Sequence, residues 1–255
     1  MIHKPTFLHQ NKPLITAMVQ AKDPETMSKL IRTASFDGCD AFGFQMERLD
    51  AEYHTDEVVR NLFMQMGNRP IYATNYRIFA NEGKSEEELA QGYLRLLELG
   101  ATLIDVIGDL YAPAQYEITR DPVAIEKQKK LIEQIHANGG EVLMSSHTHT
   151  FMSTEVVLDI AREHQARGAD ISKIVTASNS VEEEMENLRT ITVLQKELDI
   201  PFLFLAGGTH CKRIRALGPM FGCCMWLTVP LYDECATNLQ PLCRSIRAIK
   251  NNFDG

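Results

Sequence analysis

Residues 168–175 read Gly168-Ala169-Asp170-Ile171-Ser172-Lys173-Ile174-Val175, a run typical of the end of a helix, a tight turn and a short strand. The run places a single lysine, Lys173, among apolar residues. Burying an ammonium group is costly, so a lysine in such a strand is neutral, paired, or part of a site that uses it. Two interpretations are therefore open: an amine that reaches water or a carboxylate from the strand end, and an amine tuned to attack a carbonyl.

The alternation of apolar strand and helix continues in both directions from this run. We expect strands over residues 14–19, 41–47, 70–74, 102–107 and 141–146, around Lys173, and over 201–205 and 223–229. Apolar spacing and capping residues predict helices from 24, over 56–66, from 85, and over 122–137, 154–167, 181–198, 212–220 and 237–251. Eight strands alternating with eight helices predict a single-domain (β/α)8 TIM barrel over residues 1–255. An open doubly wound sheet is the weaker alternative, because no Gly-x-Gly-x-x-Gly follows the first strand.

Composition excludes several classes of function. The chain has 255 residues, of which 44% are hydrophobic and 24% charged, the balance of a globular protein with a large core. A net charge of -8 argues against nucleic-acid binding. We expect no membrane association, because residues 1–13 are unlike a signal peptide and no apolar run approaches the ~20 residues of a span. Six cysteines without a Cys-x-x-Cys pair predict reduced thiols and a cytoplasmic protein.

Polar residues gather where the expected strands end, which is where the chemistry of a barrel lies. They occupy residues 45–50, 74–77, 145–149, Lys173, 207–213 and Thr228. Any one of them has a structural explanation, such as an ion pair between Arg48 and Asp50. Their shared place at one end of the predicted barrel points instead to a site.

His147 and His149 lie two residues apart, so in an extended strand both rings point to the same side. Such a pair can bind a metal, and Asp105, Asp109 and His210 are candidate further ligands. Histidine is also the commonest proton-transfer group. We favour the acid–base role and expect no metal, with a metal-dependent barrel enzyme as an alternative.

Three runs resemble type I 3-dehydroquinate dehydratase, in the same order and on the same barrel strands. They are EVLMSSHTHTFMST (141–154), GADISKIV (168–175) and GGTHCKRIRALGPMFG (207–222). The resemblance spans nearly the whole chain, and the lysine run is its most specific part. It implies a cofactor-free Schiff-base lyase that dehydrates 3-dehydroquinate to 3-dehydroshikimate. The lysine condenses with the ketone, a histidine removes the adjacent proton and helps to expel water, and arginines hold the carboxylate.

The resemblance also assigns residues. Lys173 is the Schiff-base lysine, and His147 matches the catalytic histidine by its Ser-Ser-His context, although His149 has the better spacing to Thr154. Desolvation, helped by nearby arginines, is expected to lower the pKa of the lysine. The implied substrate-binding residues are Arg48, Arg77, Arg213, Glu47, Met46, Thr228 and Tyr232.

Some positions depart from the family pattern. Met46 stands where the family has glutamate, Lys212 replaces a serine, and residues 228–232 replace a loop containing glycine and glutamine. A site built to bond a hydroxyl can reject an analogue lacking it by roughly 10⁴- to 10⁵-fold. A Schiff-base lyase or aldolase paralogue acting on a different keto acid is therefore an alternative, as is a non-catalytic barrel that binds a carboxylate.

The expected partner is a small keto or carboxylate substrate, and the resemblance implies a homodimer. The reaction could serve aromatic amino acid biosynthesis through the shikimate pathway, or quinate breakdown.

Overall fold

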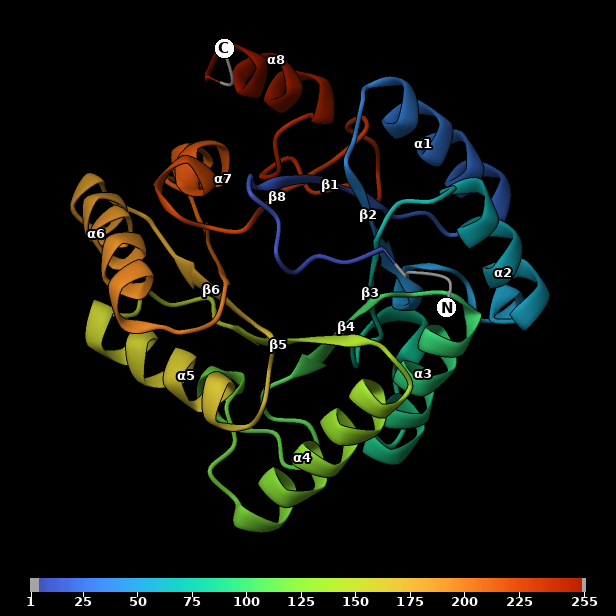
Figure 1. The fold of residues 1–255 in the computed structure, drawn as a ribbon, viewed down its shortest axis with the longest axis horizontal. Helices are drawn as coiled ribbons and strands as arrows, with labels where there is room; N and C mark the ends of the chain where they lie inside the picture. Colours follow the sequence, from blue (N-terminus) through green and yellow to red (C-terminus); the bar gives the residue numbers. More distant parts are fainter. Residues whose placement is uncertain (1–4, 254–255) are drawn as a thin grey trace.

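The computed structural model describes residues 5–253 and shows a (β/α)8 barrel (Figure 1). Its strands within that range are β1 Leu14–Val19, β2 Ala41–Gln45, β3 Ile71–Thr74, β4 Leu103–Ile107, β5 Glu141–His147, β6 Ile171–Ala177, β7 Phe202–Gly207 and β8 Met225–Thr228. Its helices are α1 Pro24–Phe36, α2 Asp56–Gln65, α3 Glu86–Leu99, α4 Pro122–Ala137, α5 Thr154–Ala166, α6 Val181–Glu197, α7 Lys212–Leu217 and α8 Cys243–Phe253. Residues 1–4, part of the N-terminal segment compared with signal peptides, lie outside the described range.

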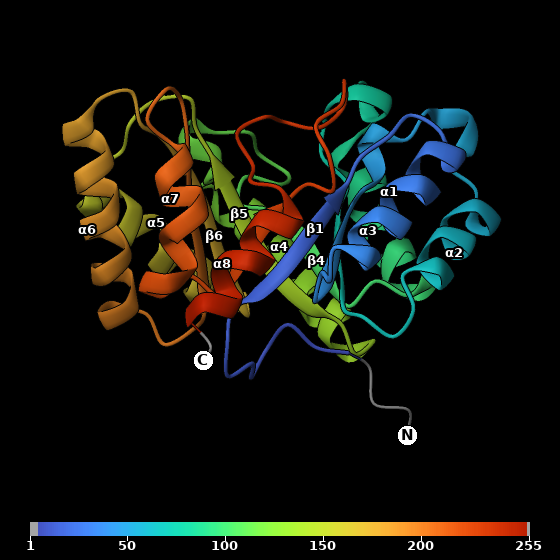
Figure 2. The ribbon, with the colours of Figure 1, turned by 90° about the horizontal axis from the view of Figure 1, so that it is seen from above.

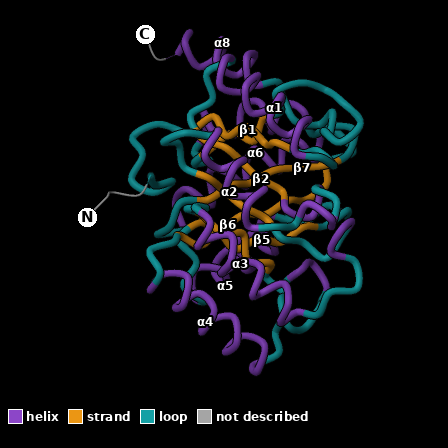
Figure 3. The backbone as a smooth tube through the Cα atoms, turned by 90° about the vertical axis from the view of Figure 1, so that its right-hand side faces the viewer, coloured by secondary structure: helices purple, strands orange, loops and turns teal. Residues whose placement is uncertain are grey.

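The strands pair in parallel in the order β7-β6-β5-β4-β3-β2-β1-β8. At the seam between the first and last of these, the backbone N–H of Cys224 donates to the carbonyl of Phe202 at 2.9 Å. The helices surround the strands in chain order (Figure 1), and the strands occupy the middle of the molecule (Figure 3). The predicted barrel is confirmed.

Local sequence explains where three of the helices begin. Asp23 accepts a hydrogen bond from the backbone N–H of Thr26, and Pro24 opens α1 without needing a donor. Ser85 and Glu88 form a reciprocal capping box at the start of α3. Asp121 caps α4 in the same manner as Asp23. The predicted starts of these helices are confirmed.

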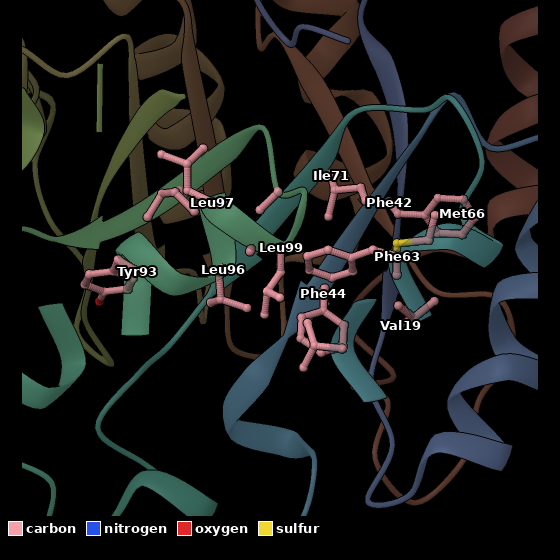
Figure 4. Close-up of a cluster of buried hydrophobic side chains, with 14 of the residues drawn as sticks. Val19, Phe42, Phe44, Phe63, Met66, Ile71, Tyr93, Leu96, Leu97 and Leu99 are labelled. Atoms are coloured by element: carbon pink, nitrogen blue, oxygen red, sulfur yellow. The ribbon is translucent and has the colours of Figure 1, made fainter. Parts of the chain in front are cut away.

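The core has two parts, one between the sheet and the helices and one inside the barrel. In the outer part, the rings of Phe44 on β2 and Phe63 on α2 meet edge to face at 5.1 Å (Figure 4). Inside the barrel, a Cβ at Gly43 would lie 2.1 Å from the Met18 sulfur and against the ring of Tyr72. The absence of a side chain at Gly43 therefore gives both residues their space.

Three predicted boundaries are wrong. The second strand ends at Gln45 instead of 47, because the chain turns into a 3₁₀-helix whose Glu47 side chain binds β3. The last helix starts at Cys243 instead of 237, since Pro241 disfavours helical backbone in the residue before it. The helix after β7 stops at Leu217, near Pro219, instead of 220.

A fourth difference concerns Cys223 and Cys224, which precede β8 instead of lying in it. Both thiols stay protonated near neutral pH, since burial raises the pKa of Cys223 to about 12 and that of Cys224 above its usual range. All six cysteines are free thiols, as predicted.

The two ends of the barrel differ (Figure 2). The loops that follow the strands, including residues 229–242 after β8, lie at one end. Residues 5–13 run across the opposite end, where the buried Phe7 donates its backbone N–H to the Glu141 carboxylate at 2.8 Å. Within residues 5–253, no helix is both long and apolar enough to cross a membrane.

Candidate active site

Lys173 lies inside the barrel on β6, and its side chain is nearly fully buried. Its Nζ donates hydrogen bonds to three groups: Tyr76 Oη at 2.7 Å, Tyr72 Oη at 2.8 Å and Asp105 Oδ2 at 3.0 Å. The groups that contact the amine are therefore a carboxylate and two phenols. No arginine is among these hydrogen-bond partners.

Strand register explains why these residues meet. Lys173 is paired with Ser145 on β5, and Asp105 lies on β4, the next strand round the barrel. Ser145 Oγ donates to Asp105 Oδ1 at 2.5 Å, while Lys173 binds the other oxygen. Tyr72 comes from β3. Four neighbouring strands, β3 to β6, therefore deliver their side chains to one layer of the barrel interior.

The Asp105 carboxyl is fully buried, and its pKa reflects opposing effects. Burial alone raises the pKa, but electrostatic interactions with Lys173 and His147 and the hydrogen bonds from Ser145 and Tyr72 lower it below its usual range. Asp105 is consequently an ionised partner for the lysine.

The two phenols remain protonated in this environment. Burial and the negative charge of Asp105 raise the pKa of Tyr72 and of Tyr76 well above the usual range. Both hydroxyls also donate to Asp105 Oδ2. Each phenol can therefore supply a proton, but neither ionises spontaneously near neutral pH.

His147 lies at the end of β5, two residues beyond Ser145 and on the same side of the strand. Its ring contacts the ring of Tyr76 edge to face, with 5.4 Å between centroids. Its Nδ1 is 2.6 Å from Oε2 of Glu117, which also accepts the His147 backbone N–H at 3.0 Å. A carboxylate at Nδ1 fixes the proton there and leaves Nε2 as the basic nitrogen.

Glu117 reaches the histidine from the β4–α4 loop, residues 108–121, in a strained conformation. Glu117 and Tyr116 have φ values of 49° and 60°, a region that side-chain-bearing residues rarely adopt. Each such residue costs about 1–3 kcal/mol unless its surroundings compensate.

Buried polar groups on the neighbouring elements supply that compensation. Ser146 Oγ donates to the carbonyl of Glu117 at 2.9 Å, while Gln128 and Arg167 donate to the carbonyl of Gly108. Gly108 itself lies so close that a Cβ there would be 2.6 Å from the Glu117 carbonyl oxygen. The loop is thus fixed where Glu117 can hold His147.

His149 lies past the end of β5 and is exposed. The structure brings His147, but not His149, into contact with the residues around Lys173. No three or more His, Cys, Asp or Glu side chains within residues 5–253 cluster closely enough to hold a metal ion.

Two of the three predicted arginines are bound to carboxylates of the chain itself. Arg77 pairs with Glu86 and Asp109 at 2.7 Å each, which ties the β3–α3 and β4–α4 loops together. Arg213 has a 66% exposed side chain and pairs with Glu184 on α6. Neither guanidinium contacts Lys173 or its partners.

Arg48 differs from these two. It is half-buried after β2, its guanidinium stacks on the Phe79 ring at 3.8 Å from the centroid, and its Nε has no hydrogen-bond partner within the described residues. Arg215, two residues after Arg213, is buried, and its Nε donates to the carbonyl of Ala206 at the end of β7. Both arginines keep donors that no carboxylate of the described chain occupies.

The other predicted binding residues have structural contacts. Glu47 is buried and accepts hydrogen bonds from Thr74 Oγ1 and from the backbone N–H of Tyr76. Thr228 Oγ1 donates to the carbonyl of Thr16. Met46 packs against the core, and Tyr232 is 52% exposed, with its hydroxyl donating to the Gln240 carbonyl.

Sequence reasoning missed part of this constellation. From the sequence, Asp105 is a candidate only as a metal ligand and Tyr76 belongs only to the polar set 74–77 at a strand end, while Tyr72, Glu117 and Arg215 have no assigned role. The available signals were Tyr72 in an otherwise aliphatic strand and Asp105 in the apolar run 103–107. No sequence pattern indicated Glu117, because its role depends on an unusual loop conformation.

The site can be compared with known proteins. Residues 15–236 match the family model described as Type I 3-dehydroquinase, whereas no curated protein matches the chain. Among solved structures, the chain is similar to 3-dehydroquinate dehydratase from Geobacillus kaustophilus, with 18% identity, 96% and 92% of the two chains covered and a TM-score of 0.78. Corresponding values for the type I enzyme from Clostridium difficile, which carries covalently modified comenic acid, are 16%, 96%, 93% and 0.79. Those for the Enterococcus faecalis enzyme are 19%, 96%, 95% and 0.72.

Proposed function

Because this chain belongs to the type I 3-dehydroquinase family, a family of hydro-lyases, we propose that it dehydrates 3-dehydroquinate to 3-dehydroshikimate through a Schiff base on Lys173. The observation that carries the proposal is the position of Lys173. It is a buried lysine on β6, held by ionised Asp105, with His147 one layer closer to the mouth of the barrel. A lysine so placed can attack a ketone that enters from the mouth.

The geometry assigns separate tasks to the residues. Nζ of Lys173 forms the imine, and the protonated imine draws electrons from the neighbouring carbon, which makes the hydrogen there acidic. Nε2 of His147 removes that proton and returns a proton to the departing hydroxyl. Glu117 holds the imidazole with Nε2 available and stabilises the positive charge that develops on the ring.

We assign the carboxylate of the substrate to Arg48, whose guanidinium has no carboxylate partner within residues 5–253. A guanidinium binds a carboxylate through two parallel hydrogen bonds. Arg215 on α7, whose Nε donates to the Ala206 carbonyl at the end of β7, takes the second place. It is preferred to Arg213, because Arg213 is paired with Glu184 on α6.

A second candidate substrate is a different keto acid. It is favoured because several residues predicted to bind 3-dehydroquinate make their contacts within the protein instead. Met46, Glu47 and Thr228 all make contacts within the protein itself, and Arg77 is fully used by Glu86 and Asp109. The lysine and histidine chemistry is the same for both candidates. A homodimer and a cytoplasmic location remain predictions.

Turnover distinguishes the two candidates. Dehydration of 3-dehydroquinate creates a carbon–carbon double bond conjugated with the ketone, so product formation is followed by ultraviolet absorbance. The proposal predicts catalytic formation of this enone. Absence of turnover, together with imine formation on another keto acid, supports the second candidate instead.

Exchanging the two histidines one at a time tests the assignment of the base. His147→Gln is expected to lower kcat by about 10²- to 10⁴-fold, the usual contribution of general acid–base catalysis. His149 is exposed, so His149→Gln should change kcat by no more than about two-fold, which corresponds to about 0.4 kcal/mol of activation free energy. Steady-state kinetics measures both, and the reverse order would transfer the role to His149.

Arginine variants test carboxylate binding. Arg48→Gln is expected to raise KM by roughly ten-fold or more, since a hydrogen bond to a charged group contributes about 1.5–3 kcal/mol. Arg213→Gln serves as the matched control and should leave KM nearly unchanged. If KM rises for Arg213→Gln and stays constant for Arg48→Gln, Arg213 is the carboxylate ligand.

A further inference from the structure

The amine of Lys173 touches a second set of proton-transfer groups, separate from His147. Tyr76 Oη is 2.7 Å from Nζ and 2.5 Å from Asp105 Oδ2, and Asp105 Oδ2 is in turn 3.0 Å from Nζ. The three groups form a closed triangle in which each is hydrogen-bonded to the other two. His147 has its Nδ1 on Glu117, outside this triangle.

Tyr76 is better placed than Tyr72 to meet an incoming ketone. Tyr72 lies within β3 and is completely buried, whereas Tyr76 follows the end of that strand and is half-buried. The Tyr76 ring also contacts His147 on the mouth side of the lysine. Glu47 fixes the backbone of Tyr76 by accepting its N–H at 3.3 Å. The hydroxyl of Tyr76 is thus held beside the nitrogen, on the side from which substrate arrives.

We propose that Tyr76 and Asp105, and not His147, carry the proton transfers that form the imine on Lys173. The inference rests on the proposed function, because it concerns the same lysine. It assigns two catalytic residues to imine formation and reserves His147 for the carbon acid and the leaving hydroxyl.

The proton balance closes within the triangle. Asp105 takes a proton from the ammonium of Lys173, and the free amine adds to the carbonyl carbon while the carbon–oxygen π bond breaks. Tyr76 gives its proton to the new oxyanion and recovers one from the nitrogen, leaving a neutral carbinolamine and a protonated Asp105. That proton then passes through Tyr76 to the carbinolamine hydroxyl, water leaves, and the iminium faces an ionised Asp105.

Each group has the properties that these steps need. The oxygen of the carbinolamine is bonded to the carbon that Nζ attacks, so a phenol 2.7 Å from Nζ is close to it. The phenol is un-ionised and can donate, because burial and Asp105 raise the pKa of Tyr76. The Asp105 carboxylate is ionised before the first step, where it pairs with the ammonium of Lys173. It is ionised again after the last step, where it pairs with the iminium nitrogen.

The rate of imine formation tests the inference. Protein is mixed rapidly with 3-dehydroquinate, quenched with borohydride at successive times, and the adduct on Lys173 is measured by mass spectrometry. Tyr76→Phe should slow adduct formation by roughly 10²-fold or more, while reaching the wild-type amount at long times, which also shows that the variant is folded. His147→Gln should form adduct at close to the wild-type rate and fail to turn it over.

Two further variants control for loss of a hydroxyl. Tyr93→Phe removes a buried hydroxyl on α3 that has no hydrogen-bond partner in the described chain, and should form adduct at the wild-type rate. Tyr72→Phe should slow the reaction less than Tyr76→Phe. A wild-type rate in Tyr76→Phe, or an equal slowing in His147→Gln or Tyr72→Phe, overturns the assignment to Tyr76.

The outcome separates this inference from the proposed function. If wild-type protein forms an adduct only with another keto acid, such as pyruvate, the proposed substrate is wrong and the Tyr76 comparison is made with that compound. If no keto acid gives an adduct on Lys173, both the Schiff base and the role of Tyr76 are excluded.

Discussion

Lys173→Met is expected to lower kcat for 3-dehydroquinate by about 10⁵-fold or more, as the loss of a covalent nucleophile does. Methionine fills most of the volume of the lysine stem but cannot form an imine. The result is measured by following the enone product at high enzyme concentration. Lys127→Met, at an exposed position on α4, is the matched control and should retain wild-type turnover.

The Lys173→Met variant leaves Asp105 buried without its charge partner, so loss of activity must be distinguished from loss of folding. Circular dichroism and the double variant Lys173→Met/Asp105→Asn, which removes both charges, provide that distinction. Both variants should be folded and inactive. Turnover above about 1% of wild type in a folded variant lacking Lys173 contradicts a mechanism that depends on a covalent nucleophile.

Asp105→Asn is expected to lower the free energy of unfolding by about 3–5 kcal/mol, the usual cost of leaving one member of a buried ion pair unpaired. Both members are nearly or fully buried, so solvent screens the pair little. The double variant with Lys173→Met should recover most of the lost stability. Asp159→Asn breaks an exposed pair with Arg120 and should cost less than about 1 kcal/mol. Urea unfolding measures all three.

Because the pKa of Asp105 is lowered, we also expect the stability of the folded protein to depend on pH. The pKa of Asp105 is lower in the folded protein than in the unfolded chain, where it is about 3.9. Its contribution to stability is therefore complete above about pH 4 to 5 and is lost as the pH falls through the lowered folded value. Wild-type protein should lose this contribution on acidification, and Asp105→Asn should not. Parallel acid unfolding curves for the two proteins would show that Asp105 has an ordinary pKa.

The architecture was predictable because its signals are local. Each strand is a short apolar run, and helix starts such as Asp23-Pro24 and Ser85 to Glu88 have side chains that cap the backbone directly. Lys173 was conspicuous for a related reason, since a charged residue in an apolar strand contradicts its surroundings. These features depend on a few neighbouring residues.

The partners of Lys173 depend on strand register, which the sequence does not display. Asp105 and Tyr72 reach the lysine only because β4 and β3 are aligned so that both side chains enter the same layer. The choice between His147 and His149 depended on where β5 ends, and Glu117 on a loop with positive φ angles.

The arginines show a further limit of predicting a binding site from sequence. A sequence motif specifies a residue type but not which acidic residue will pair with it. Arg77 and Arg213 have the expected positions in the chain. In the folded protein, however, Arg77 is paired with Glu86 and Asp109, and Arg213 is paired with Glu184. Arg48 keeps its guanidinium available because an aromatic ring, Phe79, lies against it instead of a carboxylate.

Borohydride trapping with 3-dehydroquinate tests the Schiff base on Lys173 most directly. Reduction of the imine should add the mass of the reduced substrate to the protein, and fragmentation of the peptide spanning 168–175 should locate it on Lys173. The adduct should be absent from Lys173→Met and from protein treated with borohydride alone. Catalytic turnover without any adduct on Lys173, or an adduct on a different lysine, would contradict the proposed mechanism.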